Sequence, residues 1–236
     1  MEIALFLTYR TPANAGPAPL ALFEAQLAAA PGVRQALMHV PATANDPYLK
    51  DEHAPQLVLQ LYFDELAALD AATSANGCLQ ALTDRRAITW AGGAEIAQQA
   101  MAVRRFVSSP PPAGRARCTY LVAYEGAPHD YDAWLGHYLA GHVPLMQRLP
   151  DIRELEVYTR LESASALPAR REGAVQRNKV VFDDAAALTH ALNSPIRHEM
   201  RRDFEASPPF DGHNVHYPMS SHAVPLAPAH PIGANR

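Results

Sequence analysis

His142 is the residue of this sequence whose setting best fits chemistry. It stands in the stretch YLAGHVPLMQRL (138–149), among apolar side chains, and Pro144 follows two positions later. A neutral imidazole can take or give a proton near pH 7, so a histidine on an inward helix face is a candidate acid/base. The plainer alternative is a core histidine that only pairs with a backbone carbonyl.

The element that must hold His142 is a helix predicted over residues 130–149, with Asp130 suited to its N-cap. Helical spacing puts a set of mostly aromatic residues together on its inward face: Tyr131, Trp134, Leu135, Tyr138 and His142. His137 is expected to point outward into solvent. Pro144 removes one backbone hydrogen bond, so a kink should open space between the helix and a sheet beside the imidazole.

The chain carries an internal repeat. PGVR at residue 31 matches PDIR at residue 150, and FDELAAL at residue 63 matches FDDAAAL at residue 182, so both pairs are 119 positions apart. Two matches at one separation indicate two copies of a unit of a little over 100 residues. We expect residues 1–107 as the first copy, 108–116 as a Pro-rich linker, 117–219 as the second copy and 220–236 as an irregular tail.

Each copy shows the same predicted order of elements, βαββαβ, which is the ferredoxin-like arrangement. The strands are expected at 2–9, 33–40, 56–63, 99–107, 117–125, 152–161, 175–182 and 212–219. The helices are expected at 17–30, at 64–82 with a break near Gly77, at 130–149, and as a pair between 183 and 206. The fold class predicted is therefore α+β.

Several predicted strands are apolar at both parities, among them EIALFLTY (2–9) and QLVLQLYF (56–63). A sheet covered by helices on one face only would alternate apolar and polar residues. Both faces must then be covered, and we expect the two copies to pack sheet to sheet as an α/β-barrel pseudo-dimer within one chain.

The two copies differ where chemistry would be expected. A shift of 119 residues places Phe23 opposite His142, Ala25 opposite Pro144 and Leu59 opposite Asn178. A position that is apolar in one copy and polar in the other is not polar for the sake of the fold. We therefore expect a cavity in the second copy, with Phe23 filling the corresponding space in the first.

The stretch WLGHYLAGHVPLMQRLPDIR (134–153) resembles the signature of the EthD family of the dimeric α/β-barrel superfamily. The matching residues are Trp134, Tyr138, His142, Pro144 and Leu145, followed by Pro150. The resemblance implies an apolar pocket between sheet and helices, often without a metal, for a small aromatic, lactone or polyketide-like compound. It also implies an alternative, because some members of the superfamily bind haem.

The candidate site therefore has His142 as the acid/base, with Trp134, Tyr138, Tyr120 and Asn178 around the ligand. Three functions remain open: a cofactor-independent enzyme or accessory factor, a haem-binding or haem-handling protein, and a non-catalytic binding protein. The polar run Arg177, Asn178 and Lys179 fits either a pocket wall or a solvated strand edge. His213 and His216 would point to opposite faces of a strand, which makes them a poor metal pair.

Composition narrows the class of partner. The formal net charge is −4 and there is no basic stripe, which disfavours nucleic-acid binding. The first residues, MEIALFLTYR, form too short an apolar run for a signal peptide or a membrane span. We expect a cytoplasmic protein with a small apolar or aromatic ligand, no cofactor and no metal, and leave open a homodimer of the duplicated chain.

Overall fold

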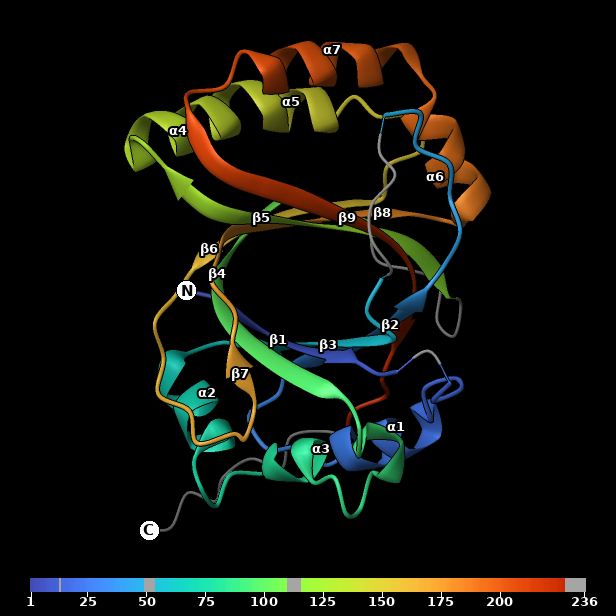
Figure 1. The fold of residues 1–236 in the computed structure, drawn as a ribbon, viewed down its shortest axis with the longest axis vertical. Helices are drawn as coiled ribbons and strands as arrows, with labels where there is room; N and C mark the ends of the chain where they lie inside the picture. The colour runs from blue at the N-terminus through green and yellow to red at the C-terminus, as the bar shows by residue number, and fades with distance from the viewer. Residues whose placement is uncertain (13, 49–53, 110–115, 228–236) are drawn as a thin grey trace, which may run out of the picture.

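The strands of the protein form one closed barrel (Figure 1). The computed structural model describes residues 1–12, 14–48, 54–109 and 116–227. Eight strands of these ranges follow one another in the order β1-β3-β2-β9-β5-β8-β6-β4, and β1 pairs with β4 to close the ring. All eight pairings are antiparallel. The strands are β1 (Ile3–Arg10), β2 (Gln35–Pro41), β3 (Leu57–Phe63), β4 (Glu95–Ser108), β5 (Arg117–Pro128), β6 (Glu154–Arg160), β8 (Ala174–Phe182) and β9 (Phe210–Ala223).

The two halves of the barrel have the same internal strand order, β4-β1-β3-β2 in the first and β9-β5-β8-β6 in the second. They are joined at their edges, because β2 pairs with β9 and β4 pairs with β6. The expected barrel is thus confirmed, and the inner faces of its two halves share one apolar cluster. The prediction did not include the hydrogen-bonded pairing along both edges. Each half would otherwise leave unpaired N–H and C=O groups along two edges, and the other half satisfies them. That both halves arose from one repeated unit stays a prediction.

Helices cover the outside of the barrel as two groups (Figure 1). Beside β1 and β3 lie α1 (Leu20–Leu27), α2 (Leu66–Thr73), α3 (Gln80–Thr83) and the short 3-10 helix η1 (Thr89–Ala91). Beside β5 and β8 lie α4 (Tyr131–His137), the π-helix η2 (Tyr138–His142), α5 (Val143–Met146), α6 (Ala185–Leu192) and α7 (Pro195–Glu205). The break predicted near Gly77 lies between α2 and α3.

The last barrel strand is longer than the sequence predicts. We expected an irregular tail from residue 220, but β9 continues to Ala223. The reason is the open edge of β2, because residues 219–223 pair with residues 37–41 of that strand. A short strand that was not predicted, β7 (Arg170–Arg171), pairs in parallel with β4. The middle of the expected linker, 110–115, and the end of the tail, 228–236, lie outside the described residues.

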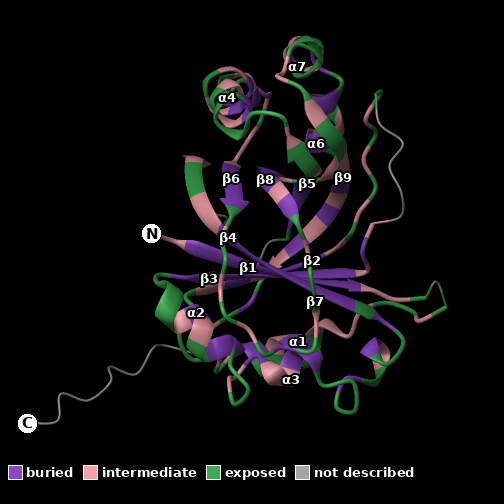
Figure 2. Ribbon diagram, turned by 60° about the vertical axis from the view of Figure 1, so that its left-hand side comes forward, coloured by how far each residue is buried: buried purple, intermediate pink, exposed green. Residues whose placement is uncertain are grey.

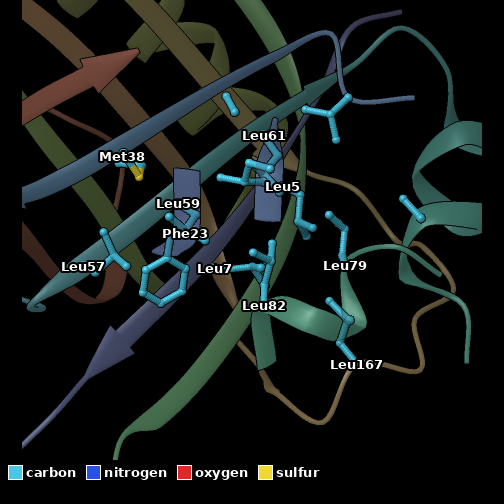
Figure 3. Close-up of a cluster of buried hydrophobic side chains, with 14 of the residues drawn as sticks. Leu5, Leu7, Phe23, Met38, Leu57, Leu59, Leu61, Leu79, Leu82 and Leu167 are labelled. Carbon is cyan, nitrogen blue, oxygen red and sulfur yellow. The ribbon is translucent and has the colours of Figure 1, made fainter. Parts of the chain in front are cut away.

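Side chains alternate along the strands between two apolar cores, one under the helices and one inside the barrel. Figure 2 shows β1 and β3 almost wholly buried, whereas β4 and β9 are buried over part of their length. Ile3, Leu5 and Leu7 of β1 face the helices, whereas Ala4 and Phe6 face the barrel interior. In the first half, Phe23 is fully buried beside Leu57 and Leu59 on the helix side (Figure 3). Phe23 is thus a core residue, and that it fills a space which lies open at the related position of the second half stays a prediction.

The barrel interior also holds a buried polar network built from both halves. Lys179 of β8 is fully buried and lies 2.9 Å from the Tyr62 hydroxyl, 3.0 Å from Glu154 and 3.2 Å from Glu156. Glu156 accepts hydrogen bonds from the hydroxyls of Tyr62 and Tyr158. The solvated-edge interpretation of Lys179 is therefore wrong, because β8 lies between β5 and β6 and the Lys179 side chain is buried inside the barrel.

The network continues from Tyr158 to the opposite side of the barrel. Gln60 donates to the Tyr62 and Tyr158 hydroxyls at 2.7 and 2.6 Å, and its side-chain oxygen lies 3.1 Å from His39 Nε2. His39 Nδ1 lies 2.7 Å from the Ser221 hydroxyl on β9. Polar groups of the first half are thus satisfied by the second, which ties the halves together through their interior as well as along their edges.

Candidate active site

The helix that carries His142 changes its pitch immediately before Pro144. Asp130 caps its start as predicted, since its side chain accepts the Ala133 N–H at 2.9 Å. At residues 138–142 the helix widens into a π turn, in which the Val143 N–H donates to the Tyr138 carbonyl, five residues back. Pro144 has no N–H to continue the regular ladder, so the distortion expected there takes the form of this π turn. Such turns are frequent at functional sites.

The buried face of this helix carries three of the residues that the sequence predicts. Trp134, Tyr138 and His142, each four residues apart, are all buried. Tyr131, which regular helical spacing placed on the inward face, is 41% exposed. That expectation was wrong because Tyr131 is the first residue of α4, at the end of the helix that lies farthest from His142.

His142 is held by an aspartate from another helix. Its Nδ1 lies 2.8 Å from Asp203 Oδ2, on α7. The partner is therefore a carboxylate and not the backbone carbonyl of the plainer alternative. His137, expected in solvent, approaches the same carboxylate, with Nε2 3.3 Å from Asp203 Oδ1. One carboxylate thus contacts both histidines.

Gly141 makes this contact geometrically feasible. A Cβ built at position 141 would lie 2.8 Å from Asp203 Oδ1, closer than real Cβ atoms approach an oxygen. Any other residue would push the carboxylate away from the two imidazoles. Sequence reasoning missed both Gly141 and Asp203, because α7 (PIRHEMRRDFE) looks like an ordinary charged helix and nothing in it distinguishes this aspartate.

The hydrogen bond fixes the protonation of the His142 ring. A carboxylate can only accept, so Nδ1 carries the hydrogen and the lone pair belongs to Nε2. Burial lowers the pKa of His142 below its ordinary value, against the opposing effect of Asp203. The ring is therefore neutral at pH 7, with Nε2 ready to accept a proton.

His142 lines a partly open cavity between the second helix group and the sheet. The cavity has a volume of about 650 Å³ with its mouth included, of which about 60 Å³ is accessible to the centre of a water molecule. Its wall is mostly apolar: Val122, Tyr124, Met146, Leu149, Val180, Phe182, Leu188, Leu192, Met200 and Phe204. Its polar residues are Tyr120, His142, Asn178, Arg197, Arg201, Asn214 and His216.

The sequence-predicted residues divide into two sets. Tyr120 and Asn178 lie on the cavity wall together with His142. Trp134 and Tyr138 lie behind that wall, where their rings stack with centroids 5.9 Å apart. The Tyr138 ring is also 4.9 Å from that of His142, so this aromatic pair supports the imidazole from behind. His216 lies on the wall as well, whereas His213 is exposed.

A loop of the first half reaches this cavity of the second half. Asp46, on the segment after β2, accepts a hydrogen bond from the Tyr120 hydroxyl at 2.9 Å and one from Arg197 Nη2 at 3.0 Å. The segment is attached to the helices, because the Asn45 N–H donates to the Thr189 hydroxyl and Asn193 donates to the Asn45 carbonyl. The first half therefore completes a site that the pairwise sequence comparison assigned to the second alone.

The fold and the site define a class of protein: an α+β chain whose closed eight-stranded antiparallel barrel is of the dimeric α/β-barrel type, with a cavity under the helices of one half. No family model matches the sequence, and no curated protein matches it either. Among the described residues, no helix is long and apolar enough to span a membrane, and no cluster of three or more His, Cys, Asp or Glu could hold a metal ion.

Solved structures do match. An anthrone oxidase-like protein shares 13% identity at a TM-score of 0.64, over 96% of this chain and 95% of that one. A putative monooxygenase from Fusobacterium nucleatum subsp. nucleatum ATCC 25586 shares 6% identity at a TM-score of 0.57, over 94% of each chain. An EthD family protein from Bacillus halodurans C-125 shares 20% identity over 42% of this chain and 96% of that one, but its TM-score is 0.33. The fold is thus established, whereas the EthD resemblance stays a prediction.

Proposed function

We propose that the chain is a cofactor-independent enzyme that moves a proton on a small aromatic or otherwise apolar carbonyl compound, with His142 as the acid/base. The observation that carries the proposal is the His142–Asp203 pair at the wall of an apolar cavity. Asp203 fixes the ring orientation, and the neutral Nε2 is left for the ligand. The name of one full-length structural neighbour, an anthrone oxidase-like protein, is compatible with an aromatic carbonyl compound as the ligand.

The chemical step needs no further reactant. Nε2 of His142 takes a proton from the carbon beside the carbonyl, the C–H bond breaks, and its electron pair moves to the carbonyl oxygen, giving an enolate. The positive charge that forms on the imidazole is stabilised by Asp203 through Nδ1, as in other carboxylate–histidine pairs. Return of the proton, to the same carbon or to another, gives exchange or isomerisation.

Deuterium exchange tests the proposal. The probe is β-tetralone, an aromatic ketone with acidic C–H groups beside its carbonyl, incubated in deuterium oxide and followed by NMR. We expect the wild-type protein to accelerate exchange above the buffer rate and His142→Phe to abolish the acceleration. Equal rates for the two proteins would refute the proposal. Saturable binding without exchange would instead identify a non-catalytic binding protein.

A haem-handling protein is the second candidate, favoured by one observation. An imidazole whose Nδ1 is bound by a carboxylate and whose Nε2 is left for a ligand is also the arrangement of many metal-binding histidines. However, the water-accessible part of the cavity, about 60 Å³, holds only about five water molecules, and a porphyrin is a much larger flat ring. The residues in this arrangement do not fit a haem, and titration with haemin is expected to give no Soret band of a ligated haem.

A further inference from the structure

Arg197 is a charged residue at the wall of a mostly apolar cavity. It projects from α7, is 9% exposed and lines the cavity together with His142. Its Nη2 donates to Asp46, but its Nε is buried and has no hydrogen-bond partner within the described ranges. A guanidinium has five N–H donors, and a buried donor without a hydrogen-bond partner destabilises the fold. A ligand atom that accepts from this guanidinium would remove that destabilisation.

Among the residues that the structure describes, one carboxylate, that of Asp46, pairs with Arg197, and it also accepts a hydrogen bond from a second donor. Asp46 Oδ2 accepts from both Arg197 and the Tyr120 hydroxyl. The Asp46 side chain is 7% exposed, so the pair is shielded from water. The Tyr48 ring, 5.2 Å from the guanidinium carbon, covers the arginine from the same first-half segment. Asp46 and Tyr48 thus hold the guanidinium at the cavity wall, where its remaining N–H groups could donate to an anionic ligand.

We propose that Arg197 is the anion-binding residue of the cavity and selects apolar or aromatic ligands that carry a carboxylate or another ionised oxygen. This inference deepens the proposed function, on which it rests for the location of the ligand. A ligand oxygen at Arg197 would lie in the same cavity as the His142 ring. The guanidinium would therefore stabilise the negative oxygen formed when the imidazole takes a proton. Asp46 would be the positioning residue that orients Arg197 from the first half of the chain.

Paired ligands of equal size test the charge requirement. The probes are benzoate and benzamide, which differ in the charge of one group, and binding is measured by calorimetry on the full chain. We expect benzoate to bind more tightly to the wild-type protein and Arg197→Gln to weaken its binding by about ten- to a hundredfold, the range for a hydrogen bond to a charged group. Benzamide binding should change little.

Arg202 provides the matched control, because it lies on the same helix and is exposed. Arg202→Gln changes the net charge by the same amount and should leave benzoate binding unchanged. Equal binding of benzoate and benzamide to the wild-type protein would overturn the inference. So would benzoate binding that survives Arg197→Gln, or the lack of any saturable benzoate binding.

Asp46→Asn keeps the inference testable if Arg197→Gln does not fold. Removing the internal counter-ion leaves Arg197 in need of an anion, so benzoate should bind more tightly and raise the melting temperature more than in the wild-type protein. Unchanged benzoate binding in Asp46→Asn would count against the inference. Failure of β-tetralone exchange alongside intact, Arg197-dependent benzoate binding would refute the proposed enzyme activity and leave the anion site standing.

Discussion

The Asp203 carboxylate packs against Gly141 so closely that no larger residue fits there. A Cβ at position 141 would lie 2.8 Å from the Asp203 carboxylate oxygen that faces His137. The empty space at the glycine is what lets α7 bring a carboxylate to the imidazole of His142. This relation makes Gly141 a sensitive point of the candidate site although it contacts no ligand.

Gly141→Ala should therefore disturb the site more than the fold. The added methyl group displaces Asp203, with a packing cost of about 1–3 kcal/mol that is partly offset by the better helix propensity of alanine. β-Tetralone exchange should fall by about tenfold, the effect of about 1.4 kcal/mol. Gly136→Ala is the matched control, because a Cβ at position 136 meets nothing within 4 Å. If both variants have equal exchange rates, the Asp203 contact does not support the chemistry.

His142→Phe separates a functional histidine from a structural one. Phenylalanine already occupies the corresponding position in the first half, where Phe23 is fully buried. If His142 serves a ligand, the variant should be as stable as the wild-type protein or more so, while ligand binding or turnover falls. Thermal melts with and without β-tetralone measure both. A clear loss of stability with binding intact would end the functional interpretation.

Stability at acid pH should depend on a second histidine, His39. Burial lowers its pKa to about 3, so the folded protein keeps it neutral where the unfolded chain would protonate it. The stabilisation is fully present above the ordinary histidine pKa, near 6.5, and is lost as the pH falls toward about 3. The lowered pKa of His142 acts in the same direction.

The expected slope for one such group is about 1.4 kcal/mol per pH unit below pH 6.5. Urea unfolding between pH 6.5 and pH 5, above the range where most carboxylates titrate, measures it. His39→Gln, which keeps a hydrogen-bonding side chain, should flatten the curve. An unchanged slope in that variant would show that His39 is not the group concerned.

Lys179 should stabilise the folded barrel through its ion pairs with buried carboxylates. Lys179→Met removes one of the two cations that pair with the buried Glu156, and Arg105 remains as the other. We therefore expect the free energy of unfolding to fall by an amount near the lower end of the range of about 3–5 kcal/mol for a broken buried ion pair. Adding Glu156→Gln to that variant removes the carboxylate that has lost Lys179 and should restore part of the loss. Chemical denaturation of both variants gives the comparison. A double variant that is less stable than the single one would contradict this electrostatic account.

Much of the fold was predictable from local patterns. The shift of 119 residues that relates FDELAAL to FDDAAAL also relates α2 (Leu66–Thr73) to α6 (Ala185–Leu192), residue for residue. It likewise relates two ion pairs, Arg34 with Asp64 and Arg153 with Asp183. Periodicity and repetition identify such elements because each is specified by its own residues.

The parts that were missed depend on distant contacts. Asp203 contacts His142 across 61 positions of the chain, and Asp46 contacts Arg197 across 151. The partner of a polar residue is fixed by the packing of helices and loops, which periodicity does not contain. The π turn was missed for a different reason, since Pro144 predicts a distortion but not its form.

The two halves of the barrel are joined by two strand pairs, β2 with β9 and β4 with β6. These pairs determine whether either half could fold as a separate fragment. A fragment ending near residue 109 would expose two open strand edges and the polar side chains that now meet Lys179 and Ser221. Such a fragment would be incompletely folded and prone to aggregate. Two complementary fragments produced in the same cell could instead associate by pairing β2 with β9 and β4 with β6. The chain is thus a permanently tethered pair, and its tether removes the concentration dependence that two separate subunits would face.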